Sequence, residues 1–203
     1  AQGEFNDLIR TVPDLLSDAM DKGNRYLATN LRTGYSSLVW LCADDPDSAI
    51  RQVDDAMTEW VSDSYSMQHY FALISRIHIS LYQDQPQEAL NWFSADEAEL
   101  ESSGLRRMHF IDMEIRILRV RAILAVFADP NSGHEKVPLV HLIKKELTSL
   151  FRSKSPWVIA LGHYLKLIFD YHQAADRLSK DQINVAIQAL EGTGLHHYAR
   201  TAR

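Results

Sequence analysis

The sequence predicts an all-α fold in which about four antiparallel helix pairs form a right-handed superhelix, or solenoid. The main observation is a helix-turn-helix pattern that recurs after forty residues, and self-similarity at such a period is typical of helical repeat arrays. The corresponding positions are Asp44, Pro46, Ala49 and Ile50 in one copy and Asp84, Pro86, Ala89 and Leu90 in the other. The second observation is that apolar residues recur at helical spacing on both sides of each turn. Because the turns are short, consecutive helices must pack antiparallel.

The predicted helices follow one another along a single domain of residues 1–203. The pairs are expected at 24–61, 67–100, 105–151 and 156–190, with flanking helices at 5–20 and 195–203. Pro13 lies inside the first flanking helix and predicts a kink or a split there, because proline removes a backbone donor and crowds the preceding turn. Gly23 then offers a left-handed stop.

The first pair consists of helices at 24–42 and 46–61. Their link, Ala43-Asp44-Asp45, supplies an acidic cap, and Pro46 suits the first turn of a helix, where its missing N–H has no partner to lose. Capping boxes are predicted at two later helix starts, by Asp84 with Gln87 and by Ser179 with Gln182.

The third pair, at 105–127 and 137–151, breaks the forty-residue period. A longer first helix and the loop at 129–136 add about twelve residues, and insertions in repeat arrays fall on an outer edge. Helix pairs bury their apolar stripes only against neighbours, so the large apolar residues of these stripes should form the core. The predicted core includes Trp40, Val53, Leu73, Phe93, Ile117 and Leu161.

Charge is unevenly distributed along the chain, whose formal net charge is −6. Residues 1–104 hold 18 acidic and 6 basic side chains, whereas residues 105–203 hold 9 and 15. The acidic balance argues against nucleic acid as a partner. The charges within the apolar stretch 105–127 argue against a membrane span. A cytoplasmic location follows as the default, because the single cysteine, Cys42, cannot form an internal disulfide. Cys42 lies on an apolar stripe, which predicts that its thiol is packed in the core.

No catalytic, metal or cofactor site is expected from the sequence. None of the nine histidines forms a ligand pair at helical spacing, and no nucleophile has a base placed beside it by a local motif. The acidic run at Asp44, Asp45 and Asp47 lacks the glycine and the distal glutamate of a calcium loop, so helix capping explains it. Likewise, Gly192-Thr193-Gly194 follows a helix and is a helix stop, not a phosphate-binding loop.

The helix pairs resemble tetratricopeptide repeats at the small and aromatic positions of that family. The matching residues are Ser37, Trp40, Ala49, Val53 and Ala56. A second resemblance covers nearly the whole chain and is to the C-terminal helical-repeat region of large bacterial serine/threonine protein kinases. It rests on the run Tyr26–Gly34, on Gln68-His69-Tyr70, on Leu81-Tyr82 and on Gly194-Leu195 with Tyr198-Ala199-Arg200.

The kinase resemblance implies a regulatory or partner-binding segment, preceded in such proteins by a kinase domain and often by an ATPase module. It carries over no catalytic residue, because the kinase signatures are absent from the sequence. The opening Ala1-Gln2-Gly3, without an initiator Met, also suits a segment of a larger protein. We therefore expect a non-enzymatic protein-interaction module whose partner is a protein or peptide, including the parent protein's own kinase or ATPase portion.

The expected binding surface is the inner face of the superhelix, formed by the first helix of each pair. The residues expected on or beside this face are Asn30, Arg32, Gln68, His69, Arg76 and Arg116. Arg76 and Arg116 are one repeat apart and would suit an extended acidic peptide. The alternative is a small-ligand sensor of an ATPase-linked transcription regulator, with Tyr26, His69 and Tyr70 around a pocket.

Overall fold

The computed structural model describes residues 5–174 and 178–202, and all secondary structure in these residues is helical. The chain divides into two compact units, an N-terminal unit that ends at Asp112 and a C-terminal unit that begins at Met113. The prediction of an all-α protein is therefore confirmed. Among the described residues, no helix combines the length and the apolar character that crossing a bilayer requires.

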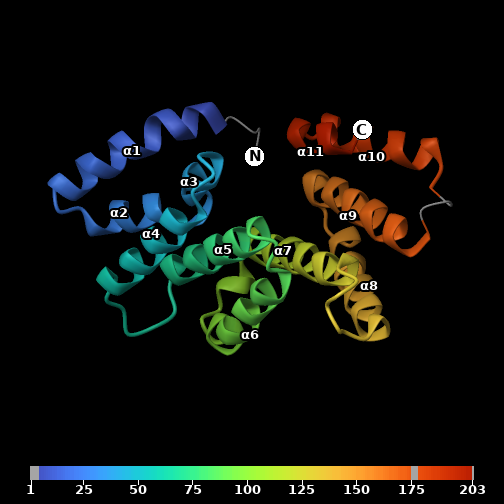
Figure 1. Cartoon of the computed structure of the whole chain (residues 1–203), viewed down its shortest axis with the longest axis horizontal. Helices are drawn as coiled ribbons and strands as arrows, with labels where there is room; N and C mark the ends of the chain where they lie inside the picture. Colours follow the sequence, from blue (N-terminus) through green and yellow to red (C-terminus); the bar gives the residue numbers. More distant parts are fainter. Residues whose placement is uncertain (1–4, 175–177, 203) are drawn as a thin grey trace. The chain divides into compact units, whose positions relative to one another are not determined.

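The N-terminal unit contains eight complete helical segments and the start of a ninth. They are α1 (Phe5–Asp21), α2 (Arg25–Arg32), the 3-10 helix η1 (Gly34–Ser37), α3 (Leu38–Cys42), α4 (Pro46–Glu59), α5 (Met67–Tyr82), α6 (Pro86–Ser102), the 3-10 helix η2 (Leu105–Arg107) and the first residues of α7 (His109–Ala128). The segment α2–η1–α3 packs against α1, α4 and α5, and α5 packs in turn against α4 and α6 (Figure 1).

The core of the N-terminal unit lies in two clusters of buried side chains. Leu16, Ala19, Ala28 and Leu31 join α1 to α2. Leu41, Ala49, Val53, Ala72 and Ile79 join α3, α4 and α5. Five of the six predicted core residues of the chain are buried as expected, and Trp40 is half-buried between the two clusters.

The recurring turn of the sequence is a recurring hydrogen-bonded turn in the structure. After α1, α3, α5 and α10 (Lys180–Gly192), one residue adopts a left-handed conformation, and the next N–H donates to the carbonyl five residues earlier, at 2.8 to 2.9 Å. The left-handed residues are Gly23, Asp44, Asp84 and Gly194. This geometry satisfies carbonyls at the end of the helix and reverses the chain. It explains why an aspartate recurs forty residues apart.

Local differences from the sequence prediction have identifiable causes. The helix expected at 24–42 is broken, because Thr33 is extended and Gly34 is left-handed with φ +64°, so that η1 and α3 start in a new direction. Cys42 is exposed at the end of α3, so the packed thiol expected from the sequence is wrong. The helix expected from 105 instead starts at His109, after η2.

The predicted helix starts are partly confirmed. Pro46 and Pro86 lie in the first turns of α4 and α6, and the capping box of Ser179 is formed at the start of α10. The capping box of Asp84 is wrong, because that residue forms the preceding turn and Gln85 takes the cap position without a side-chain bond. The kink or split expected at Pro13 is not seen as a break, since α1 is one helix from Phe5 to Asp21.

The C-terminal unit contains most of α7 and four further helices, α8 (Lys136–Phe151), α9 (Pro156–Ala174), α10 and α11 (His196–Thr201). Within this unit, α9 packs against both α8 and α10, and α10 packs against α11 (Figure 1). Ile143 and Leu150 of α8 and Val158 of α9 are completely buried. The unit is therefore a second set of helices with its own core.

Candidate functional site

Helix α5 runs alongside α2–η1–α3 in one constant register. Three polar pairs join the two segments, and the partners in each pair are 38 residues apart. They are Asn30 with Gln68, Ser37 with Ser75, and Asp44 with Tyr82. A constant separation along two segments means that they run parallel, as the first helices of successive pairs do in a repeat array.

Two further contacts fill the gaps between these polar pairs. The Phe71 side chain lies against Gly34, and the His78 and Tyr35 rings are tilted with their centroids 5.7 Å apart. Together, α5 contributes Gln68, Phe71, Ser75, His78 and Tyr82 to this contact line, at alternating spacings of three and four residues. Such spacing keeps residues on one face of a helix. We call this contact line between α5 and α2–η1–α3 the seam.

The seam is polar at its buried centre and exposed at two aromatic positions. The Ser37 hydroxyl donates to the Gly34 carbonyl at 2.7 Å and lies 3.1 Å from Ser75 Oγ. By contrast, Tyr35 and Tyr82 are 48% and 46% exposed. The Tyr82 hydroxyl donates to Asp44, and this hydrogen bond raises the pKa of Tyr82. Half-exposed aromatic rings on a rigid support are typical of protein-binding surfaces.

Asn30, Arg32 and Gln68, three of the residues expected at the binding surface, lie in or next to the seam. Gln68 is buried, and its side-chain amide donates to Asn30 Oδ1 at 3.3 Å. Arg32 is also buried, and its guanidinium pairs with Glu59 of α4 at 3.1 Å. All three side chains therefore join helices of the N-terminal unit.

His69 and Arg76 project from a different face of α5, because residue 69 is rotated by about 100° from residue 68 and residue 76 by the same angle from residue 75. This face is turned toward α4 and α6. Arg76 pairs with Asp54 of α4 at 3.0 Å and covers the Trp92 ring of α6, with 4.6 Å from its guanidinium carbon to the ring centroid. The structure therefore does not bring all five predicted residues of the N-terminal unit onto one face.

A half-buried polar cluster surrounds His69 on this second face. The His69 ring stacks on Tyr65, with centroids 5.2 Å apart, and its Nδ1 accepts from the Ser66 N–H at 3.1 Å. The Tyr65 hydroxyl donates to Asp96 of α6 at 2.9 Å. Burial raises the pKa of Tyr65 and also that of Asp96. These contacts tie the segment before α5 to α6.

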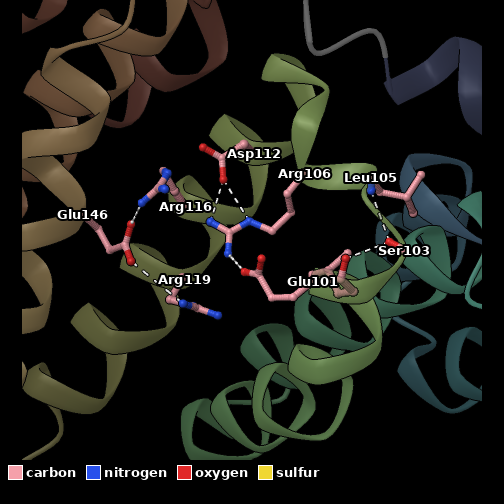
Figure 2. Close-up of polar contacts among 9 residues, drawn as sticks. Glu101, Ser103, Leu105, Arg106, Asp112, Arg116, Arg119 and Glu146 are labelled. Atoms are coloured by element: carbon pink, nitrogen blue, oxygen red, sulfur yellow. Dashed lines mark hydrogen bonds and ion pairs between the residues drawn. The ribbon is translucent and has the colours of Figure 1, made fainter.

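Arg116, the sixth predicted residue, lies in the C-terminal unit. Its guanidinium is 2.6 Å from the buried Glu146 carboxylate of α8, and Arg119 approaches the other oxygen of the same carboxylate at 3.9 Å (Figure 2). In the N-terminal unit, Arg106 lies between Glu101 and Asp112 in a comparable arrangement (Figure 2). Arg32, Arg76 and Arg116 each have a carboxylate partner within their own unit.

The C-terminal unit has a shallow depression of about 340 Å³, lined by Phe127, Lys136, Val137, Val140, His172 and Gln173. The residues suggested for a ligand pocket lie elsewhere, in the N-terminal unit: Tyr70 is completely buried, and the ring of Tyr26 packs near that of Trp60. Among the residues that the structure describes, no three His, Cys, Asp or Glu side chains are grouped so that they could hold a metal ion.

Sequence reasoning missed Tyr35, His78 and Tyr82 as residues of the seam. The alternating spacing of 68, 71, 75, 78 and 82 is a signal that could have found this face of α5, because it mixes polar and aromatic residues within an apolar helix.

Comparison of the chain with known proteins finds no matching family model, no matching curated protein and no matching solved structure.

Proposed function

We propose that this chain is a non-catalytic protein-interaction and regulatory module of a larger bacterial signalling protein, a serine/threonine kinase. In this proposal the helix pairs form a right-handed, tetratricopeptide-like superhelix. The partner is a protein segment, including segments of the parent protein's own kinase or ATPase portion. The kinase resemblance of Tyr26–Gly34 and Gln68-His69-Tyr70 supports this context.

The observation that carries the proposal is the seam. Five contacts hold α5 against α2–η1–α3, so the exposed rings of Tyr35 and Tyr82 stand on a support with a fixed register. Binding a partner on a rigid surface does not require the surface to be ordered first, which lowers the entropic cost of association. Exposed tyrosines add large contact area and a hydroxyl that can hydrogen-bond.

Selection of displayed random peptides tests this function. We expect the unmodified chain to enrich peptides that the double variant Tyr35→Ala, Tyr82→Ala no longer binds. The matched control is Tyr171→Ala, which removes an equally exposed tyrosine from α9 in the C-terminal unit. Circular dichroism checks that all variants remain helical. Peptides that bind the double variant as well as the unmodified chain, or the absence of any enriched peptide, would contradict the proposal.

A second candidate is a small-ligand sensor, favoured by the depression in the C-terminal unit. Phe127 and Val140 would contact an apolar body, and the Lys136 ammonium, 5.2 Å from the Phe127 ring centroid, would attract an acidic group. A thermal-shift screen of small apolar carboxylic acids tests this candidate. Stabilisation that disappears in Lys136→Gln would support it, and no stabilisation by any acid of the screen would count against it.

A further inference from the structure

We infer that the partner segment bound at the seam is basic, with lysine or arginine side chains placed at Tyr35 and Tyr82. This inference rests on the proposed function and specifies the chemistry of its partner. Residues 4–112, the N-terminal unit, contain 19 acidic and 8 basic side chains, a formal net charge of −11. A field of this sign attracts cations and accelerates the binding of basic partners.

The local charge at the Tyr82 end of the seam has the same sign. Asp44 accepts the Tyr82 hydroxyl, and Asp45 and Asp84 lie in the adjoining turns; all three carboxylates are exposed. Hydrogen bonds from Ser48 lower the pKa of Asp45, which keeps this carboxylate ionised. The last carbonyls of α5 add the partial negative charge of a helix C-terminus. The side chains of the two turns therefore offer a cation three carboxylates at this point and no basic group.

Of the basic side chains of the N-terminal unit, Arg51 of α4 is close enough to Asp45 to help lower its pKa, whereas the two arginines that the sequence placed at the binding surface are engaged elsewhere. Arg32 is buried and held by Glu59, and Arg76 is on the other face of α5, held by Asp54. An acidic peptide, which the spacing of arginines in the sequence suggested, would thus find these guanidinium groups engaged. It would also be repelled by the carboxylates of the turns.

The dimensions of the seam suit a short extended segment. The Tyr35 and His78 ring centroids are 5.7 Å apart, and His78 and Tyr82 are four residues apart on α5, which corresponds to about 6 Å at 1.5 Å per residue. Alternate residues of an extended chain are about 6.6 Å apart and point to the same side, so two side chains of such a segment match this spacing. Cations on alternate residues could lie over the exposed tyrosine rings, whose faces attract them.

Fluorescence anisotropy with three labelled nine-residue peptides tests the inference, one alternating Lys with Leu, one Gln with Leu and one Glu with Leu. We expect only the lysine peptide to bind, with an affinity that falls as salt is added. Asp44→Asn should weaken its binding about two- to fivefold, the range typical of one exposed ion pair. Asparagine tolerates the left-handed backbone at this position, and it can still accept the Tyr82 hydroxyl.

The matched control is Asp55→Asn, which removes the same charge from an exposed position on α4. Equal weakening by Asp44→Asn and Asp55→Asn would overturn the inference, because binding would then follow net charge rather than the seam. Equal binding of the glutamine or glutamate peptide, lost in Tyr35→Ala, would also overturn it while leaving the proposed function intact. If no peptide depends on Tyr35 or Tyr82, both the inference and the proposed function fail.

Discussion

Replacing Gly34 with alanine should destabilise the N-terminal unit by about 2–5 kcal/mol. Gly34 has φ +64°, where alanine costs about 1–2 kcal/mol more than glycine. An added Cβ would also lie 3.3 Å from Phe71 Cδ1, which is closer than most carbon atoms approach. Overpacking of this kind costs about 1–3 kcal/mol, because the Phe71 ring is held between α5 and η1 and must shift.

Gly23→Ala separates the two contributions. Gly23 has the same φ of +64°, but an added Cβ there would have no atom within 4 Å, so only the backbone cost of about 1–2 kcal/mol applies. Urea unfolding followed by tryptophan fluorescence measures both variants. In a Trp157→Phe background the signal comes from the N-terminal unit alone, since the other three tryptophans lie there. Equal losses for Gly23→Ala and Gly34→Ala would refute the close contact with Phe71.

Three further predictions test the core, a buried carboxylate and the exposed thiol. Leu73→Ala, at a fully buried position of α5, should lower the free energy of unfolding by about 2–5 kcal/mol, whereas Val61→Ala, at an exposed position, should change it by less than about 0.5 kcal/mol in urea titrations. Burial raises the pKa of Asp96, so the folded state holds the Asp96 proton to a higher pH than the unfolded state does, and the contribution of this residue to stability falls as pH rises above 3.8. In urea titrations between about pH 3.5 and about pH 7, Asp96→Asn should remove this decrease in the free energy of unfolding. An unchanged decrease in the variant would show that Asp96 is not its cause. Cys42 is exposed, so it should react completely with a disulfide reagent in the folded protein. The reaction at neutral pH should be slower than that of free cysteine, because desolvation raises the pKa of the Cys42 thiol. A Cys42 thiol that reacts only in denaturant would be packed and would contradict this prediction.

The helices were predictable from the sequence to the extent that their signals are local. Pro46 and Pro86 mark helix starts because the first turn tolerates a missing N–H. The break at Gly34 was not predictable in the same way, since the sequence does not show that this glycine adopts φ +64° or that Phe71, 37 residues later, lies against it. The role of Asp84 was misjudged for a related reason: an aspartate can cap a helix or adopt a left-handed turn, and the sequence alone does not distinguish these uses.

The candidate site was less predictable because it depends on which face of α5 each residue occupies. Gln68 and His69 are adjacent in sequence and were expected on one surface, yet they project about 100° apart. The ion pairs of the arginines could not be predicted because the partners are distant in sequence: Arg32 pairs with Glu59, and Arg76 pairs with Asp54. Tertiary pairing of this kind leaves no periodic signal in the sequence.

The polar pairs of the seam are what give its two exposed tyrosines a defined position. An entirely apolar contact between parallel helices can shift by a turn at low cost, because apolar packing has no direction. Shifting α5 against η1 would part the buried Gln68 amide from Asn30 and Ser37 from Ser75, although each serine would keep a hydrogen bond to a backbone carbonyl of its own segment. Leaving the Gln68 amide without Asn30 costs about 1–3 kcal/mol, so the observed register is favoured over its neighbours. Tyr35 and Tyr82 are thereby held at a fixed separation, which is the condition for recognising a partner segment by the spacing of its side chains.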